Sequence, residues 1–269
     1  MPTIPPPSPL FGHRPGVWIK ESWLRFSGMT LQTRMVLLQV ENALALYSPT
    51  PAQLDPSIIA EIRAHGEPRW LIAPNEIHNV GLGAFQGAFP DAHTTGCLGH
   101  PRRVQGVRFD VLLDTLSPPD AVPWTQSGEL RFHVIGGNRL LHEIAVLHVP
   151  SKTLVLTDAV EWIDPEKHLH GEPPGAVMTW GMRRMGLRYW TACMSPEHYM
   201  LCVDPDALEA SLRALDSWDY DSLVISHGRI FDGDEARVAV QTAFGSTLAA
   251  IRNRGVMSRA AWSVLSRLV

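Results

Sequence analysis

The hydrophobic pattern of this chain alternates between short apolar runs and stretches with helical spacing. The runs Met35–Val40 and Ala43–Tyr47, separated by a short polar pair, predict a β-hairpin. Apolar residues at helical spacing after Pro56 predict a helix, and Asp55 is its expected N-cap. Similar apolar runs predict strands at 69–73, 92–95, 130–135, 143–149, 153–157 and 222–226, and a short helix at 81–89.

The later part of the chain carries mostly helical patterns. Helices are predicted from Pro205 and from Asp234 onward. A helical insert rich in Met and Trp, preceded by a Gly/Pro-rich loop, is expected at about 160–203. Residues 1–15 are predicted to form a proline-rich arm with no packing pattern. Because neither a repeat nor a boundary divides the rest, we expect residues 16–269 to form a single α/β domain with mixed sheets.

The composition excludes several classes of protein. With 23 Lys and Arg against 27 Asp and Glu, the chain has no excess of positive charge with which to bind nucleic acid. No apolar run is long enough for a membrane span, and the N-terminus lacks the pattern of a signal peptide. Three scattered cysteines, Cys97, Cys193 and Cys202, do not suit a disulfide framework, so a reduced cytoplasmic setting is expected.

Side chains that can bind metals follow the carboxyl ends of three predicted strands. Glu76 and His78 follow the first of these strands, Asp158 the second and His227 the third, while His142 precedes another strand. Strand ends are where α/β sheets place their ligands, so we expect these residues to gather. Imidazole and carboxylate groups bind Zn²⁺, Fe and Mn²⁺. Although the chain has 12 histidines, only three of them therefore enter the predicted metal site.

These residues resemble the metal-binding motifs of the metallo-β-lactamase fold superfamily. The stretch Pro74–Gly81 corresponds to the first motif, His-x-His-x-Asp-His, and His142, Asp158 and His227 correspond to the later His, Asp and His. The resemblance covers roughly residues 30 to 230. Within the superfamily, the chain is similar to a divergent branch in which PN-x-x-H replaces the first motif. It implies a four-layer αββα sandwich, with two mixed sheets face to face and helices outside.

The first motif departs from the family pattern at four positions. Pro74 replaces the first His and cannot bind a metal, and Asn79 replaces the fourth His and is at best a weak ligand. Glu76 replaces the second His, as in the flavodiiron branch, and His78 replaces the Asp. The resemblance therefore carries over directly only for the three later residues, His142, Asp158 and His227, with Glu76 and His78 as substitute ligands.

The resemblance implies a metal-dependent hydrolase that acts on a small ester, amide or thioester through a metal-bound hydroxide. A single ion shared by His78, Asp158 and His227 is the simplest arrangement, because three protein ligands plus water suit a catalytic zinc. Two ions, of zinc or iron, are the alternative, the second then being held by Glu76, His142 and Asp158.

Two other functions remain open at this stage. One is a degenerate member of the fold that binds a small molecule or a partner without turnover, which Pro74 and Asn79 favour. The other is a non-haem di-iron oxidoreductase, which Glu76 favours. Metal content separates the three hypotheses, because both enzymes need a metal and they differ in which one.

Several remaining features are interpreted as structural. The insert at 160–203 is expected to pack in the core or to cover the active site, with a homodimer contact or a membrane-surface helix as alternatives. The His168-x-His170 pair lies in a loop and is interpreted as solvated, with a lid that supplies a ligand as the alternative. Seven other histidines are interpreted as surface or packing residues: His13, His65, His93, His100, His133, His148 and His198.

Overall fold

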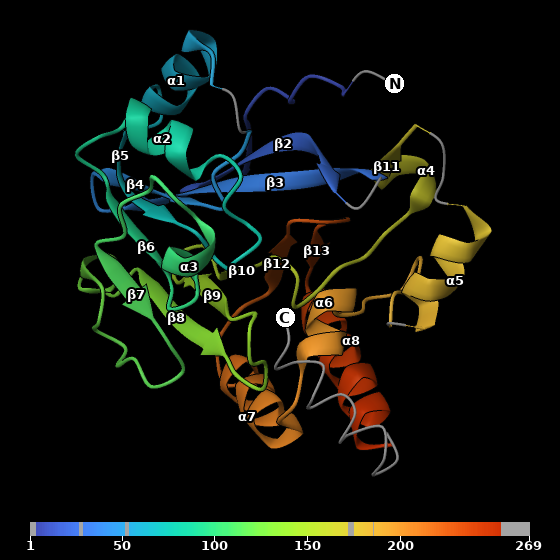
Figure 1. Ribbon diagram of the computed structural model, residues 1–269. Helices are drawn as coiled ribbons and strands as arrows, with labels where there is room; N and C mark the ends of the chain where they lie inside the picture. The colour runs from blue at the N-terminus through green and yellow to red at the C-terminus, as the bar shows by residue number, and fades with distance from the viewer. Residues whose placement is uncertain (1–3, 27–28, 52–53, 172–174, 185, 254–269) are drawn as a thin grey trace.

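Two β-sheets that pack face to face form the centre of the molecule, and helices cover both outer faces (Figure 1). The computed structural model describes residues 4–26, 29–51, 54–171, 175–184 and 186–253. Each sheet contains both parallel and antiparallel neighbours. The αββα sandwich with two mixed sheets that the sequence predicts is therefore confirmed.

The first sheet has the strand order β1-β2-β3-β4-β5-β6-β7, and β11 pairs with β3 off this path. Strands β1 to β4 run antiparallel to their neighbours, while β4 to β7 run parallel. Because the hairpin turn between β3 and β4 is tight, Glu41 adopts a positive φ of 54°. The strands are β1 (Phe11–Arg14), β2 (Val17–Phe26), β3 (Met29–Val40), β4 (Ala43–Tyr47), β5 (Glu67–Ile72), β6 (His93–Cys97), β7 (Val111–Leu113) and β11 (Leu169–His170).

The second sheet has the strand order β13-β12-β10-β9-β8. The neighbours β10 and β12 run parallel, and all the other neighbouring strands in this sheet run antiparallel. The carboxyl ends of β10 and β12 therefore lie side by side. The strands are β8 (Leu130–Ile135), β9 (Glu143–His148), β10 (Thr153–Leu156), β12 (Ser222–Ile225) and β13 (Phe231–Asp232).

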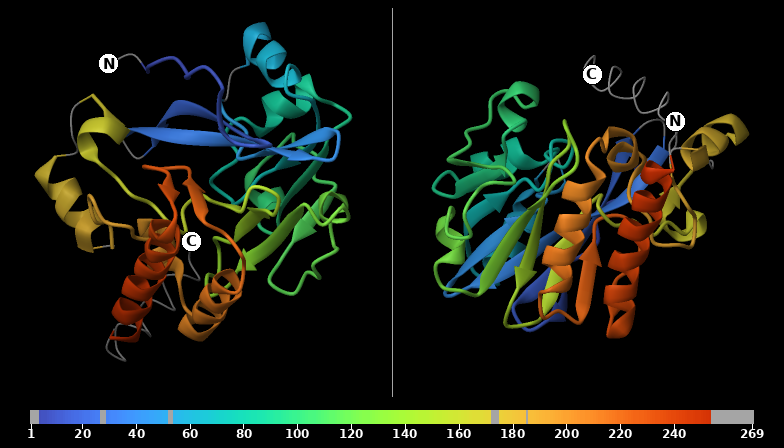
Figure 2. Two further views of the ribbon diagram at one scale, coloured as in Figure 1. Left: turned by 180° about the vertical axis from the view of Figure 1, so that it is seen from behind. Right: turned by 90° about the horizontal axis from the view of Figure 1, so that it is seen from below.

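The helices cover the outer faces of the two sheets (Figure 2). Helices α1 and α2 pack on the first sheet, and α7 and α8 pack on the second. Asp55 caps α1 as predicted, because its side chain accepts the backbone N–H groups of Ser57 and Ile58. The helices are α1 (Pro56–Arg63), α2 (Leu82–Ala88), α3 (His100–Arg103), α4 (Pro165–His168), α5 (Ala176–Arg184), α6 (Pro196–Leu201), α7 (Pro205–Asp216) and α8 (Asp234–Arg252), with a 3₁₀ turn at Pro123–Thr125.

The apolar side chains pack in three layers, one between the two sheets and one under the helices on each outer face. In β3, Val36 and Leu38 point between the sheets, while Met35 and Leu37 point to α1 and α2. Side chains in a strand alternate between the two faces, so a strand buried on both faces is a continuous apolar run. The same rule places Val224 of β12 between the sheets.

The predicted proline-rich arm at 1–15 needs a correction at its end. Phe11–Arg14 forms β1, which pairs with β2 through the turn at Gly16, where φ is 76°. Arg14 also forms ion pairs with Asp221 and Asp232. Main-chain pairing therefore anchors a segment whose side chains carry no strand pattern. Among the described helices, none is long and apolar enough to cross a membrane.

Candidate metal centre

Three loops meet at one end of the two sheets, and each contributes one residue of ligand type. His78 lies in the loop after β5, Asp158 in the loop after β10 and His227 in the loop after β12. The last two are neighbours because β10 and β12 are parallel. The first sheet supplies His78 from the opposite layer. The rigid strands thus fix the starting point of each loop, as expected for ligand sites in α/β folds.

The ligand atoms of these three residues converge on one point. His78 Nε2 lies 3.1 Å from His227 Nε2 and 3.3 Å from Asp158 Oδ1. His227 Nε2 lies 3.6 Å from the same Asp158 oxygen. All three side chains are buried, and no other such group of three or more His, Cys, Asp or Glu is found in the described part of the chain. We call these three residues the His78 cluster.

Hydrogen bonds on the far side of each imidazole orient the rings. His227 Nδ1 donates to the backbone oxygen of Gln32 at 2.6 Å, which leaves the Nε2 lone pair free to accept or ligate. His78 Nδ1 lies 2.9 Å from Ser48 Oγ, a hydroxyl that can accept from it. Metal-binding histidines in proteins are held in this way, with the other nitrogen bonded to a carbonyl or a polar side chain.

The backbone after His227 fixes the third loop. Trp162 N donates to the His227 backbone oxygen at 3.0 Å. Gly228 has a φ of 131°, and a Cβ there would lie 2.1 Å from the Trp162 oxygen. Only glycine fits this close approach, so the residue after His227 is determined by the backbone of the neighbouring loop.

The pKa values of the two histidines in the His78 cluster are shifted in opposite directions. Burial lowers the pKa of His78, but the charge and hydrogen bond of Asp158, together with the charges of Glu143 and Glu197, outweigh burial and leave this pKa raised. Burial and the nearby His78 charge lower the pKa of His227 to about 4. Burial raises the pKa of Asp158, yet His78 and His227 hold it well below its ordinary value. A proton on His78 Nε2 would lie between the Asp158 carboxylate and the His227 imidazole.

The donor set of the cluster fits a divalent metal ion. Two imidazole nitrogens and one carboxylate oxygen can face the same point, so a cation there would be held by three protein atoms. Three protein ligands with room for water are typical of catalytic zinc, and two His with one carboxylate are also typical of non-haem Fe(II). The geometry thus favours a single metal ion and accepts either element.

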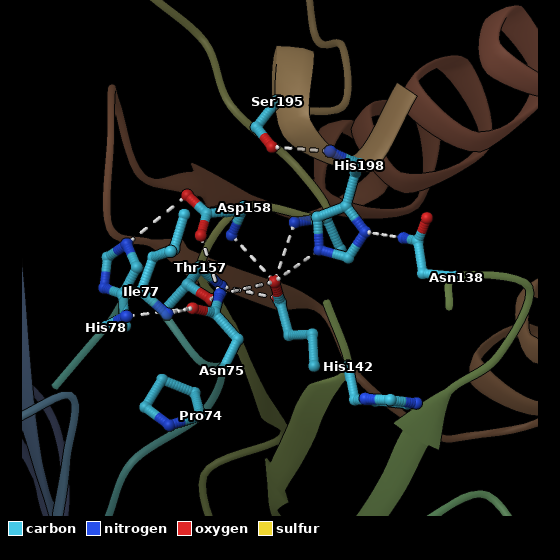
Figure 3. Close-up of polar contacts among 12 residues, drawn as sticks. Pro74, Asn75, Ile77, His78, Asn138, His142, Thr157, Asp158, Ser195 and His198 are labelled. Carbon is cyan, nitrogen blue, oxygen red and sulfur yellow. Dashed lines mark hydrogen bonds and ion pairs between the residues drawn. The ribbon is translucent and has the colours of Figure 1, made fainter. Parts of the chain in front are cut away.

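Asn75 ties two of the three loops together (Figure 3). Its Oδ1 accepts the backbone N–H groups of Ile77 at 3.0 Å and His78 at 2.9 Å. Its Nδ2 donates to Asp158 Oδ2 at 2.6 Å and to Thr157 Oγ1 at 2.9 Å. One amide therefore sets both the turn that carries His78 and the orientation of the Asp158 carboxylate.

Glu143 holds the main chain of the loop that carries Asp158. Its Oε1 accepts Thr157 N at 2.8 Å, and its Oε2 accepts Asp158 N at 2.9 Å and Ala159 N at 3.0 Å. His198 Nε2 lies 3.2 Å from Oε2, and both side chains are fully buried. This Glu143–His198 pair positions the ligand loop without facing the ligand atoms.

Glu76 and His142 contact each other and lie outside the His78 cluster. Glu76 Oε1 lies 3.0 Å from His142 Nδ1, and Oε2 accepts His142 N at 2.8 Å. Burial raises the pKa of Glu76, but His142 outweighs it and leaves this pKa lowered. Figure 3 shows His142 apart from Asp158, at the start of β9. The structure thus brings together three of the five predicted ligands and pairs the other two; their predicted metal role stays a prediction.

A cavity of about 520 Å³ opens at the cluster. His78, Asp158 and His227 line one end of it, together with Glu161 and Glu197. Burial raises the pKa of Glu161 well above its ordinary value, and the Asp158 charge adds to this effect. Burial and Asp158 also raise the pKa of Glu197. Two further carboxyl groups therefore share the cavity with the candidate ligands.

Sequence reasoning missed several residues of this site. Asn75 stands in the PN-x-x-H stretch, between residues that replace histidines of the family motif. His198 is fully buried against Glu143, whereas its sequence context predicts only a surface or packing residue. Glu161 follows Asp158 by one short turn, and Glu197 lies in the first turn of α6. The only sequence signal for these carboxyl groups is their nearness to Asp158 and to the Ser195-Pro196 helix start.

Comparison with solved structures identifies the fold. A metallo-β-lactamase from Hirschia baltica superimposes with a TM-score of 0.60 and 13% identity, over 90% of this chain and 98% of that one. The chain has the metallo-β-lactamase fold. The lactamase FIM-1 from Pseudomonas aeruginosa in its mono-zinc form gives a TM-score of 0.57 at 13% identity, over 91% of this chain and 98% of that one.

A flavodiiron core shares the same fold. The Flv1 flavodiiron core from Synechocystis sp. PCC6803 gives a TM-score of 0.60 at 13% identity, over 93% of this chain and 63% of that one. Comparison with protein-family models finds no match, and comparison with curated protein sequences finds none either. The likeness therefore establishes the fold, and the chemistry has to be argued from the site.

Proposed function

We propose that this protein is a metal-dependent hydrolase of a small ester, amide or thioester. The observation that carries the proposal is the convergence of His78 Nε2, His227 Nε2 and Asp158 Oδ1 at the wall of a cavity large enough for a small molecule. A divalent ion held by these atoms would supply a Lewis acid that activates water and polarises a carbonyl group.

The chain's own residues would perform the other tasks of hydrolysis. Asn75 and Glu143 hold the Asp158 loop, and Ser48 and the Gln32 backbone orient the two imidazoles. Glu161 and Glu197 line the cavity, where carboxyl groups can hold and release the proton that water gives up. The reaction needs only water, because the water oxygen joins the acyl carbon and the leaving group departs with a proton.

Iron chemistry is the second candidate function. The likeness to the Flv1 flavodiiron core and the two-His, one-carboxylate donor set favour it. A di-iron centre needs a second group of ligands, and the two residues predicted for it, Glu76 and His142, contact each other instead. The arrangement therefore supports one ion better than two, and zinc hydrolysis better than di-iron redox chemistry.

Metal analysis combined with one substitution tests the proposal. Protein purified without added metal is expected to contain close to one equivalent of zinc and to hydrolyse simple esters. Asp158→Ala should lower metal affinity by at least about 1,000-fold, because each ligand of a zinc site contributes several kcal/mol. Activity should fall with it. The exposed Asp120→Ala is the matched control and should change neither.

Each contrary result points to a different function. Protein with no metal above trace level would support a member of the fold that binds a ligand or partner without turnover. Iron with a near-ultraviolet charge-transfer band would support the redox function. Esterase activity that survives in Asp158→Ala would place the reaction elsewhere on the molecule.

The remaining expectations on partners and location stay predictions. The insert exposes Trp180, 61% accessible, and Trp190, 55% accessible, which supports the predicted homodimer contact. Cys97, Cys193 and Cys202 are buried and are not joined by a disulfide bond, which suits the reducing compartment expected from the sequence. Sedimentation analysis of Trp180→Ser checks the dimer: the variant should shift towards monomer, and unchanged sedimentation would remove the insert from the contact.

A further inference from the structure

The lining of the cavity changes character along its length. The end at the His78 cluster is polar. Most of the other lining residues come from β2, β3, β11 and the segment around α5. Figure 1 shows β11 beside β3, on the side of the molecule that also carries α4 and α5. Most of the lining side chains from these elements are apolar, including Leu24, Leu31, Leu169, Met182 and Leu187, while Ser22, Arg25 and Thr33 of β2 and β3 are polar.

The charge of the lining disfavours anions. Three carboxyl side chains, those of Asp158, Glu161 and Glu197, stand at the polar end. Among the described lining residues, Arg25 alone is a Lys or an Arg. Apart from a metal ion at the His78 cluster, which would take the reacting carbonyl group, a ligand that carries a further carboxylate or phosphate has Arg25 as its one cationic side chain among these lining residues. A neutral ligand needs no such cation.

The size of the cavity exceeds what the reacting group alone needs. Binding sites for drug-sized ligands span roughly 300–1,000 Å³, and this cavity has about 520 Å³. An acetyl group and a water molecule would leave most of the apolar wall exposed. A ligand that buries apolar groups against this wall binds more tightly, by roughly fourfold in affinity for each methylene group buried.

We propose that the substrate is an uncharged ester or thioester whose acyl group is an apolar chain of medium length. The acyl chain lies along Leu24, Leu31 and Leu169, and its carbonyl group lies at the His78 cluster. This inference rests on the proposed hydrolase function for the reaction, but the choice of ligand rests on the cavity alone. Hydrolysis adds one water: its oxygen bonds to the acyl carbon, the C–O or C–S bond breaks, and the alcohol or thiol leaves with a proton.

Ligand binding tests the inference without any turnover. Calorimetric titration compares three compounds: 2-nonanone, an uncharged ketone that cannot be hydrolysed; acetone, its short counterpart; and nonanoate, its anionic counterpart. We expect 2-nonanone to bind at least 100-fold more tightly than acetone and at least tenfold more tightly than nonanoate. Equal binding of 2-nonanone and acetone, or tighter binding of nonanoate, would overturn the inference.

Two substitutions from different elements locate the acyl chain. Leu31→Trp in β3 and Met182→Trp in α5 both fill the apolar part of the cavity and should weaken 2-nonanone binding at least tenfold. The second variant keeps the test valid if the first does not fold. Leu116→Trp, at a side chain that is 88% accessible and outside the cavity, is the matched control and should leave binding unchanged. Full affinity in both folded cavity variants would contradict the placement.

Hydrolysis of p-nitrophenyl esters separates this inference from the proposed function. We expect kcat/KM for the octanoate ester to exceed that for the acetate ester at least tenfold, and Leu31→Trp should reduce this ratio. Hydrolysis without a preference for chain length, together with no binding of 2-nonanone, would overturn the inference and leave the hydrolase standing. Tight binding of 2-nonanone with no hydrolysis of any ester would overturn the hydrolase and leave the apolar ligand site.

Discussion

Two buried groups of histidine and carboxylate lie side by side in this protein, and they differ in how their polar atoms are used. In the Glu143–His198 pair, the carboxylate accepts three backbone N–H groups and the imidazole. In the His78 cluster, Asp158 shares one oxygen with two imidazoles whose Nε2 atoms face each other at 3.1 Å. The first group is satisfied by the protein itself, while the second gathers donor atoms around one point.

The difference shows that burial and residue type do not by themselves identify a metal site. Both groups are buried, and both combine His with an acidic residue. Only the His78 cluster lines the cavity, and only there do the ligand atoms converge. The Glu143–His198 pair is a support for the main chain. The following predictions, from the largest expected effect to the smallest, test whether the two groups are as different as their geometry indicates.

Glu143→Gln should cause the largest loss of stability. The amide keeps one acceptor but turns an NH₂ group towards backbone N–H donors or His198, so buried donors lose their acceptor. We expect the free energy of unfolding to fall by about 2–4 kcal/mol, measured by urea denaturation. Glu67→Gln, at an exposed residue paired with Arg63, is the matched control, with an expected change below about 0.5 kcal/mol. A loss as small as the control's would show that Glu143 does not hold the loop.

Ser48→Ala should weaken the metal site with a much smaller effect on stability. Ser48 Oγ lies 2.9 Å from His78 Nδ1, so its loss frees the ring to turn away from the cluster. Removal of such an outer partner costs roughly 10- to 100-fold in metal affinity, and we expect about tenfold by competition with a chelator. Ser127→Ala, in the turn before β8, is the control. Equal affinity in the two variants would mean that the ring is held by other contacts.

His142→Ala should have almost no effect on the metal. His142 contacts Glu76 and takes no part in the His78 cluster, so metal affinity should stay within about threefold, or less than about 0.7 kcal/mol, of the unchanged protein. The same chelator competition measures it. A loss comparable to that of Asp158→Ala would instead put His142 in the metal site, as the resemblance implied, and would bring a second ion back into consideration.

The sequence was sufficient for most of the elements and for the order of the ligand loops. Apolar runs with turn residues between them predicted the hairpin of β3 and β4, and Asp55 with Pro56 predicted the start of α1. Both signals are local, since they depend on a few neighbouring residues. The placement of candidate ligands at strand ends is local in the same sense, and it named five residues that include the three that gather, His78, Asp158 and His227.

The sequence could not tell which residues of one polar stretch face the candidate metal site and which hydrogen-bond elsewhere. Glu76 and His78 are two residues apart, yet one bonds to His142 and the other faces Asp158. Adjacent residues His142 and Glu143 differ in the same way. Which of two neighbouring side chains reaches the site depends on the path of the loop, and that path depends on hydrogen bonds from Asn75 to residues more than 80 positions away.

The sequence by itself therefore determined most of the strands, the longer helices, the α/β class and a set of five candidate ligands, because hydrophobic period and capping act over a few residues. Tertiary structure alone decided that Glu76 and His142 pair with each other, that Asn75, Glu143 and His198 hold the loops, and that the cavity is apolar along most of its wall. These contacts join segments far apart in the chain, so their partners become known only when both sheets are in place.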